Sequence, residues 1–307
     1  MTGVSVIIPT YNRGPLLEEA LASVTSQTYK DYEIIVADDG STDDTLTRLE
    51  RYGDRVKVLS LPRSGKPSVA RNAAIAVATG KYVAFLDSDD GWAPAKLENQ
   101  INLLERDPSF VMSYCDAAFL GENGDRLGLQ SQREHLRSGW VFNHLLLGNF
   151  IPCPTVLVRR DVVLDVGGFE QWLTMSEDWH LWLKLSARGK VGLINAPLCQ
   201  IRVHSRAITT DKMLLFADAV RVLDDIEKRF PEEFGKHRLN ARRGRAKMLS
   251  MLARNHLFSG QTLEARRLFS RALASFPLRL DIIPFFLLAL FGRRFVLTLR
   301  SFKKAVW

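Results

Sequence analysis

The 307-residue sequence lacks several features that would each define a class of protein. Its three cysteines are odd in number and widely spaced, so they form no disulfide framework or zinc pattern, and a reducing compartment is the simplest expectation. No basic stretch precedes the first apolar residues, and Pro9 interrupts them, which predicts a first strand and not a signal peptide. The apolar run Ile282–Gly292 has 11 residues, whereas a spanning helix needs about 20, so we expect it not to cross a bilayer.

Acidic residues are scarce only at the C-terminal end. Residues 236–307 contain 16 Lys and Arg but 2 acids, whereas residues 1–235 contain 26 basic and 32 acidic residues. The basic tail predicts an anionic partner, either a membrane surface or nucleic acid. Its apolar, Phe-rich end favours lipid, with the run Ile282–Gly292 in the membrane interface, and no nucleic acid is expected. The alternative is a core helix that packs on the rest of the protein.

Strands and helices alternate in the first 91 residues. Short β-prone apolar runs predict strands, and apolar residues at helical spacing predict the helices between them. This alternation predicts a parallel sheet covered by helices. Ser41 and Asp44 resemble a capping box for the second helix. The expected strands are Val4–Ile8, Tyr32–Ala37, Val56–Leu59 and Tyr82–Leu86, and the helices are Pro15–Ser26, Thr42–Arg51 and Val69–Ala78.

Polar and acidic residues follow three of these strands. They are Thr10–Asn12, the pair Asp38 and Asp39, and Asp87–Asp90. Carboxyl ends of parallel strands share one edge of a sheet, where such folds hold their ligands, so these residues are expected in one crevice. Converging carboxylates repel each other unless a cation lies between them, and hard oxygen ligands suit Mg²⁺ or Mn²⁺. A metal-diphosphate site is therefore favoured over an acidic turn in which Asp90 merely caps a helix beginning near Trp92.

The second half mixes both kinds of element. Asn123-Gly124 indicates a hairpin turn. Glu177 and Asp178 begin a strongly apolar helix, where the helix dipole favours carboxylates; capping and catalysis both remain open for them. After residue 210 the pattern is entirely helical. The expected helices are Trp92–Arg106, Gly139–Leu147, Arg160–Val166, Met175–Arg188, Met213–Arg229 and a pair within Ala241–Ser275, and the strands are Phe110–Phe119, Thr155–Val158, Val191–Ile194 and Leu198–Val203.

These segments together resemble the family 2 glycosyltransferases, inverting enzymes of the GT-A fold that use nucleotide-sugar donors. The resemblance covers about residues 3–210, in order and at the family's spacing. The matching segments are SVIIPTYNR (Ser5–Arg13), VADDGSTDDT (Val36–Thr45), ARNAAI with ATGKYVAFLDSDD (Ala70–Asp90), GGFE (Gly167–Glu170), SEDWHLWLKL (Ser176–Leu185) and RVHS (Arg202–Ser205).

The resemblance implies roles for individual residues. Thr10, Tyr11 and Asp39 would bind the nucleoside, Asp39 by accepting from a ring N–H, and Arg71 would lie near the nucleotide. Asp87 and Asp89 would form the DxD pair, with Asp89 the direct ligand of Mn²⁺ or Mg²⁺. His204 would face the metal or the diphosphate. Asp178 would be the general base that takes a proton from the acceptor hydroxyl, with Glu177 as the next candidate.

The expected architecture is an α/β catalytic domain of the GT-A type, residues 1–210, with a mixed, mostly parallel sheet and a helical basic appendage, residues 211–307. Residues 1–91 would form its nucleotide half and residues 92–210 its acceptor half. The QxxRW motif of processive synthases is absent after Asp178, which favours transfer of one sugar, expected from a UDP-sugar to a saccharide or lipid-linked acceptor.

This activity would serve bacterial cell-surface polysaccharide or glycolipid synthesis, at the inner face of the cytoplasmic membrane. Two alternatives stay open. One is a nucleotidyltransferase, although the loop TYNRGP after the first strand is not the Gly-rich basic loop typical of that class. The other is a catalytically silent protein that binds nucleotide-sugars or acts as a scaffold.

Overall fold

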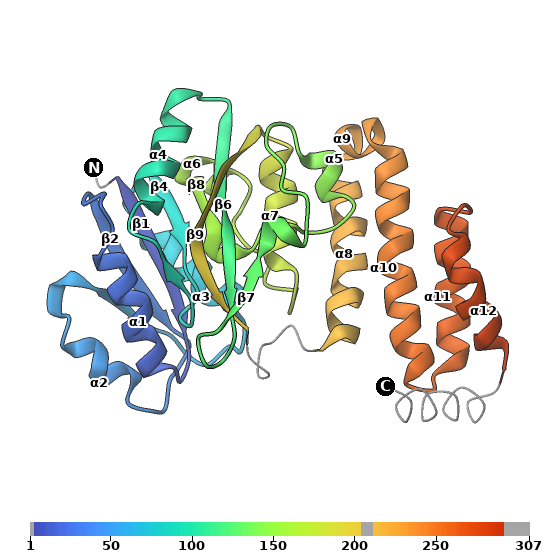
Figure 1. The fold of residues 1–307 in the computed structure, drawn as a ribbon, viewed down its shortest axis with the longest axis horizontal. Coiled ribbons are helices and arrows are strands. Elements are labelled where there is room, and N and C mark those ends of the chain that lie inside the picture. Colours follow the sequence, from blue (N-terminus) through green and yellow to red (C-terminus); the bar gives the residue numbers. More distant parts are fainter. Residues whose placement is uncertain (1–2, 204–210, 292–307) are drawn as a thin grey trace. The chain divides into compact units, whose positions relative to one another are not determined.

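Nine strands form one mixed sheet in the computed structural model, which describes residues 3–203 and 211–291. The strand order is β3-β2-β1-β4-β8-β6-β9-β5, and β7 pairs with β6 (Figure 1). The run β3-β2-β1-β4 is parallel, as the alternation of strands and helices predicts, whereas β8 pairs antiparallel with both β4 and β6. The strands are β1 (Val4–Thr10), β2 (Tyr32–Asp38), β3 (Lys57–Ser60), β4 (Tyr82–Phe85), β5 (Gly91–Trp92), β6 (Phe110–Leu120), β7 (Arg126–Leu129), β8 (Val156–Arg159) and β9 (Lys190–Arg202).

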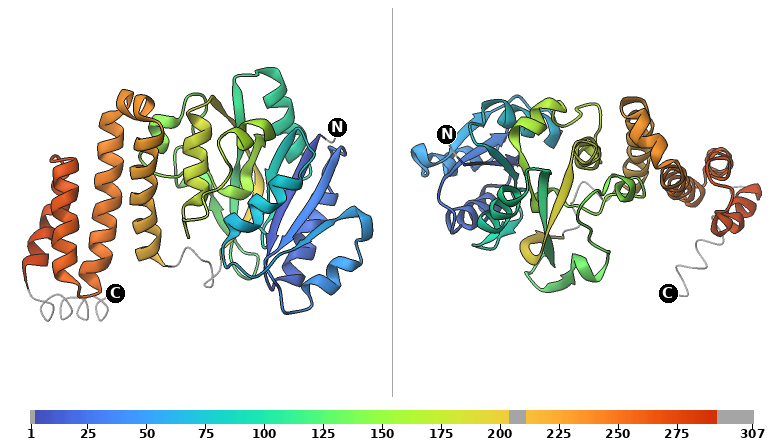
Figure 2. Two further views of the ribbon diagram at one scale, coloured as in Figure 1. Left: turned by 180° about the vertical axis from the view of Figure 1, so that it is seen from behind. Right: turned by 90° about the horizontal axis from the view of Figure 1, so that it is seen from above.

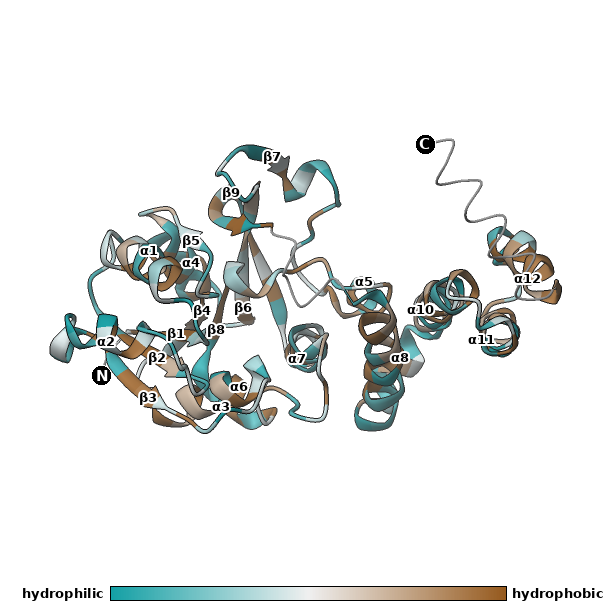
Figure 3. Ribbon diagram, turned by 90° about the horizontal axis from the view of Figure 1, so that it is seen from below, coloured by the Kyte–Doolittle hydropathy of each residue, from teal (hydrophilic) through white to brown (hydrophobic). Residues whose placement is uncertain are grey.

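Helices cover both faces of the parallel strands, with α1 and α4 on one face and α3 and α6 on the other (Figure 3). Alternate residues of β1 enter the core on the α1 and α4 side, together with Leu17 and Leu97. On the opposite face, Phe85 of β4 packs edge-on against Phe169. Both faces of these strands are therefore buried, which explains their almost continuous apolar character. The helices are α1 (Gly14–Thr25), α2 (Thr45–Glu50), α3 (Pro67–Val77), α4 (Lys96–Arg106), α5 (Phe142–Leu145), α6 (Arg160–Asp165) and α7 (Glu177–Ser186).

Several local predictions from the sequence are wrong. Ser41 and Asp44 form no capping box, because the Ser41 hydroxyl donates to Asp38 and α2 begins only at Thr45. The helix expected from Trp92 begins at Lys96, since Gly91–Trp92 is drawn into the sheet as β5 against β9.

Two further differences concern the second half of the sheet. The strands expected at Val191–Ile194 and Leu198–Val203 are a single strand, β9, whose register against β6 shifts on both sides of Asp116. The helix expected at Gly139–Leu147 is reduced to α5. The Asn123-Gly124 hairpin is confirmed, because β6 and β7 pair antiparallel around it and Gly124 has a φ of +82°.

The chain forms two compact units. The sheet and helices α1–α4, α6 and α7 lie in the first, which comprises Met1–Phe142, Asn149–Trp172 and Glu177–Ala207. The second comprises Ile208–Trp307 and two short segments from earlier in the chain, Asn143–Gly148 and Leu173–Ser176.

The second unit is helical throughout its described C-terminal part, as the sequence predicts, and α10 and α11 lie side by side in it (Figure 2). Apolar positions of α10 and α11 form its interior, and the ring of Phe286 on α12 meets Phe269 edge-on. None of the helices in the described ranges is both long enough and apolar enough to cross a membrane. The helices are α8 (Lys212–Arg229), α9 (Pro231–Lys236), α10 (Arg238–Phe258), α11 (Thr262–Ser275) and α12 (Ile283–Leu290).

The backbone of α10 closely approaches the backbone of the segment Asn143–Gly148 at Gly244. A Cβ added at Gly244 would lie 1.8 Å from the carbonyl oxygen of Leu146, a distance that no real contact allows. A glycine inside a helix costs roughly 1 kcal/mol relative to alanine, so this position trades helix propensity for close packing.

We therefore expect Gly244→Ala to destabilise the protein, although alanine is the better helix former. Urea unfolding measures the effect. The matched control is Gly235→Ala in α9, where the added Cβ meets nothing within 4 Å and the change should be neutral or stabilising by about 0.5–1 kcal/mol. Equal stabilisation by both substitutions would show that α10 does not pack on the Leu146 backbone in solution.

Candidate active site

The carboxyl ends of the parallel strands bring the predicted nucleoside residues to one edge of the sheet. The register pairs Thr10 at the end of β1 with Asp38 at the end of β2. The hydroxyl oxygen of Thr10 is buried and has no hydrogen-bond partner in the structure. Such an orphan is uncommon in folded proteins, where buried polar atoms are almost always paired. This edge therefore presents an unsatisfied polar atom where the sequence predicts a nucleotide.

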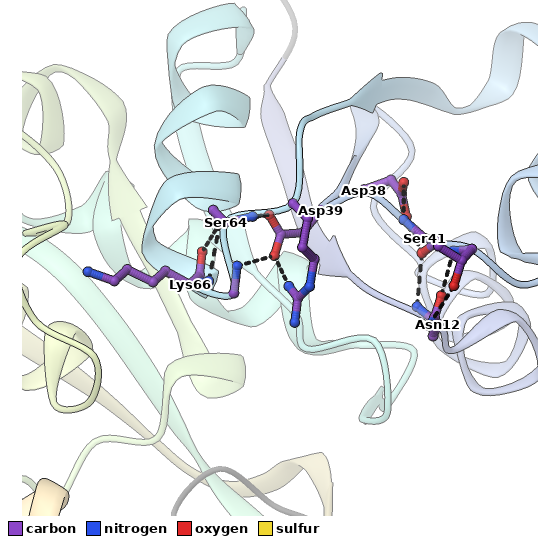
Figure 4. A network of polar contacts seen from close by, with 9 residues as sticks. Asn12, Asp38, Asp39, Ser41, Ser64 and Lys66 are labelled. Atoms are coloured by element: carbon purple, nitrogen blue, oxygen red, sulfur yellow. Dashed lines mark hydrogen bonds and ion pairs between the residues drawn. The ribbon is translucent and has the colours of Figure 1, made fainter.

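Asp39 lies at the same edge and is held by the loop before α3 (Figure 4). Its carboxylate accepts hydrogen bonds from the backbone N–H and the hydroxyl of Ser64, at 2.8 and 2.7 Å, and from the N–H of Gly65 at 2.8 Å. Burial alone would raise the pKa of Asp39, but these hydrogen bonds and the positive charge of Arg63 lower it below its ordinary value. Asp39 is therefore a fixed, ionised acceptor.

Arg63 belongs to none of the sequence motifs, and the structure places it at this edge of the sheet. Its guanidinium pairs with Asp39, and its Cζ atom lies 3.5 Å from the centroid of the Tyr11 ring. Asn12 has a φ of +50°, and its amide oxygen accepts the N–H of Thr42, which ties the ends of β1 and β2 together. The predicted nucleoside residues Tyr11 and Asp39 are thus joined through one cation.

The acidic loop after β4 carries the three carboxylates that the sequence placed there. Asp89 pairs with Arg13, and Asp87 pairs with Arg71 at 2.7 Å. Asp90 caps no helix: it is buried and accepts the backbone N–H of Arg202, at the end of β9, at 2.9 Å. Burial, and then the negative charges of Asp87 and Asp89, raise the pKa of Asp90 well above its ordinary value. The loop therefore crowds three acids together, and this crowding and burial favour the protonated form of Asp90.

Arg71 connects this loop to the helix that begins at Glu177. The residue is 4% exposed, and its guanidinium donates to Asp87 with one nitrogen and to Glu177 Oε1 with the other, at 2.8 Å. The guanidinium also faces the ring of Phe169, from the GGFE segment, at 5.3 Å. Arg71, from the ARN segment, therefore joins acids from two distant motifs, LDSDD and SED, which the sequence shows only as separate segments.

Asp178 lies in the first turn of α7. One carboxylate oxygen accepts the N–H of Trp179 at 2.6 Å, and the other accepts the side-chain amide of Asn149 at 3.0 Å. Burial, and then the charge of Glu177, raise the pKa of Asp178 to about 7. The Asn149 side chain is oriented, because its oxygen accepts the N–H of Ile151. Asn149 belongs to no motif, so the sequence alone gives no signal for its role.

Two of these acids could hold a divalent cation. Within the described residues no cluster of three or more His, Cys, Asp and Glu side chains is arranged to bind a metal. Asp87 and Asp89 nevertheless fit Mg²⁺ or Mn²⁺, which accept one or two carboxylates and complete their coordination with phosphate oxygens and water. Burial and then the negative charges of Asp87 and Asp89 raise the pKa of Asp90, and a cation would relieve the second of these two effects. His204, the other predicted metal residue, lies outside the described residues.

The fold and these motifs are those of a transferase that uses nucleotide-sugars. Comparison with known proteins supports this class. The model of the family described as "Glycosyl transferase family 2" matches residues 5–166, more than half of the chain. The protein belongs to this family, which confirms the resemblance drawn from the sequence.

Two relatives illustrate the match. An uncharacterised glycosyltransferase of Rickettsia conorii is 36% identical over 204 residues, which are 66% of this chain and 33% of the relative. The chain thus spans about a third of the length of that relative. WfgD of Escherichia coli, a "UDP-Glc:alpha-D-GlcNAc-diphosphoundecaprenol beta-1,3-glucosyltransferase", is 31% identical over 213 residues, 68% of this chain and 80% of WfgD.

Solved structures agree with the expected GT-A fold. TarS residues 1–349 of S. aureus superpose with a TM-score of 0.67 at 22% identity, covering 89% of this chain and 80% of that one, and TarS has also been solved with UDP-GlcNAc. The mannosyltransferase PcManGT of Pyrobaculum calidifontis, solved with GDP-Man and Mn²⁺, has a TM-score of 0.56 at 19% identity and covers 93% of this chain and 83% of its own. At these identities the likeness concerns the fold alone.

Proposed function

We propose that the protein is a metal-dependent, inverting glycosyltransferase that moves one sugar from a UDP-sugar to a hydroxyl of a saccharide or lipid-linked acceptor. The observation that carries the proposal is the pair of ion pairs of Arg71, which join the DxD acid Asp87 to Glu177, the neighbour of Asp178. A group for the leaving diphosphate and the neighbour of the proposed base are thereby joined to one buried arginine.

The donor end would be formed by the strand edge. The orphan hydroxyl of Thr10 and the fixed carboxylate of Asp39 are suited to a nucleoside, which offers both donors and acceptors. TarS, which shares the fold, has been solved with UDP-GlcNAc, and this supports a UDP-sugar donor. Asp87 and Asp89 would hold Mn²⁺ or Mg²⁺, which, when bound, stabilises negative charge on the departing diphosphate.

The acceptor end would be served by Asp178. Inversion requires a single displacement, so the acceptor hydroxyl attacks the anomeric carbon opposite the leaving group and must lose its proton as it attacks. A base works best when its pKa is close to the operating pH, and the pKa of Asp178 is raised to about 7. The side-chain amide of Asn149 donates to one oxygen of Asp178, and the backbone N–H of Trp179 donates to the other. These two hydrogen bonds would fix the orientation of the carboxylate toward the acceptor hydroxyl.

A lipid-linked acceptor is the finer part of the proposal. WfgD is named for its acceptor, an N-acetylglucosamine that is linked through a diphosphate to undecaprenol. We extend this acceptor class to the present chain and place its activity in bacterial polysaccharide or glycolipid synthesis, at the inner face of the cytoplasmic membrane. Such an acceptor would require the protein to work close to a bilayer.

The metal role predicts that nucleotide binding depends on both the cation and Asp89. UDP binding, measured by calorimetry, should be strong with Mn²⁺ and weak with chelator, and Asp89→Ala should abolish the difference. Asp54→Ala is the matched control, because Asp54 is an exposed aspartate outside the site. Equal UDP affinity in wild type with Mn²⁺, wild type with chelator and Asp89→Ala would contradict the metal site.

The base role predicts that Asp178→Asn retains UDP binding but lowers transfer by about 10²-fold or more, since a positioned base typically contributes ~10²–10⁴-fold. The wild-type rate should rise with pH around 7, as Asp178 loses its proton, and the residual rate of the variant should lack this rise. The pKa of Asp178 is about 7 in the folded protein and near 4 in the unfolded chain, so the wild type loses stability as the pH rises from 4 to 7. Asparagine does not ionise. The variant should therefore be more thermostable than wild type at pH 8 and similar to it at pH 4. Transfer by Asp178→Asn at the wild-type rate would place the base elsewhere, with Glu177 the next candidate.

The C-terminal part of the second unit would be the membrane contact. Leu287 and Leu290 on α12 are each more than half exposed, and Figure 3 shows α12 as mainly hydrophobic. The ring of Phe285, on the same helix, packs against Phe258 of α10. One face of α12 is therefore anchored within the helical unit, while Leu287 and Leu290 would contact lipid and the basic residues of the tail sequence would attract an anionic surface.

This arrangement predicts partial salt sensitivity. In liposome flotation the protein should bind anionic vesicles, high salt should weaken binding without ending it, and the double variant Leu287→Glu/Leu290→Glu should lose the salt-resistant part. Leu164→Glu is the matched control, because Leu164 is 47% exposed on α6 of the first unit. A wild-type protein that floats with neither anionic nor neutral vesicles would make α12 a purely structural helix.

A further inference from the structure

The region between the second half of β6 and residue 152 carries no recognisable motif, yet the structure forms a cavity there. Its volume is about 260 Å³, below the roughly 300–1,000 Å³ of pockets for drug-sized ligands. All of its lining residues belong to the first unit. They include Phe119, Gln130, Arg133, Asn149 and Phe150.

Gln130 is the unusual member of this lining. The residue is only 4% exposed, and its amide nitrogen donates to the carbonyl oxygen of Phe150 at 2.5 Å. That bond fixes the amide orientation and leaves Oε1, which is buried and has no hydrogen-bond partner. Leaving a buried acceptor unpaired costs roughly 1–3 kcal/mol, so the position calls for a donor from outside the protein.

Asn149 connects the cavity to the proposed base. It lines the cavity, and its side-chain amide donates to Asp178 Oδ2 at 3.0 Å. A ligand in the cavity would therefore lie one side chain away from the carboxylate that is to remove a proton. The donor residues at the ends of β1 and β2 contribute nothing to this lining.

The remaining lining is amphipathic. The rings of Phe119 and Phe150 supply apolar surface, and the guanidinium of Arg133 lies 4.3 Å from the centroid of the Phe119 ring, held there by a hydrogen bond to the carbonyl of Leu127. A pyranose ring has apolar C–H faces and a rim of hydroxyls, which match aromatic surface and a few fixed polar groups. An alkyl chain would leave the buried amide oxygen without a donor, and the residues predicted to bind the nucleoside lie outside this lining.

We propose that this cavity is the subsite for the acceptor sugar, with Gln130 Oε1 accepting a hydrogen bond from one acceptor hydroxyl and Asn149 marking the side that faces Asp178. The proposal rests on the proposed glycosyl transfer and goes further by naming the residues that select the acceptor. A site that hydrogen-bonds a substrate hydroxyl rejects analogues that lack it, so Gln130 is a specificity-determining residue.

Saturation-transfer NMR with methyl glycosides of glucose, galactose, mannose and N-acetylglucosamine tests the cavity without knowledge of the natural acceptor. Wild type, saturated with UDP and Mn²⁺, should bind at least one of these pyranosides. Gln130→Met should weaken that binding about tenfold. Arg133→Ala removes an exposed side chain of the lining, so it endangers folding less and should weaken binding as well.

The matched controls lie outside the cavity: Gln171→Met, which changes an exposed glutamine of the first unit, and Arg126→Ala on β7. Binding that is absent for all four pyranosides, or unchanged in both Gln130→Met and Arg133→Ala, would overturn the subsite. UDP binding measured on the same samples separates the two levels of inference. Wild type without UDP binding would overturn the proposed function itself, whereas intact UDP binding with unaffected sugar binding overturns only the acceptor subsite.

Discussion

The buried guanidinium of Arg71 is the interaction on which the rest of the site depends. Taking a cation out of water is costly, and it is tolerated here because Asp87 and Glu177 both receive hydrogen bonds from it. Removing one partner of such a buried group typically costs about 3–5 kcal/mol, since the other charge is left uncompensated. The loop after β4, helix α3 and the start of α7 are consequently fixed relative to one another by charge and not only by packing.

A second constraint is the crowding of three acids after β4. Arg13 and Arg71 each pair with one of them, and the buried Asp90 accepts the backbone N–H of Arg202. A divalent cation bound beside Asp87 and Asp89 would relieve the repulsion between these carboxylates. An acidic turn that served only to begin a helix would show the opposite arrangement, with exposed and mutually distant carboxylates.

Local patterns were sufficient to predict the parallel strands and the residues at their ends, because apolar runs and Gly or Pro breaks act over a few residues. They failed where a partner far along the chain decides. The two-residue strand β5 exists through its pairing with Cys199 and Gln200 of β9. Arg13 reaches Asp89 across 76 positions, and Asn149 reaches Asp178 across 29. No spacing rule links such residues, so Arg13, Arg63 and Asn149 could be identified only from the structure.

The border between the two compact units also depends on distant partners. Asp218, on α8, is fully buried, and one of its oxygens accepts the N–H groups of both Thr174 and Met175. Ser176 follows with a φ of +61°, and Glu177 begins α7 immediately after it. A chain cut at residue 210 would leave these two N–H groups without their acceptor, next to a residue with a positive φ. Helix α8 therefore helps to hold the backbone of residues 173–176, which directly precede Glu177 in the sequence.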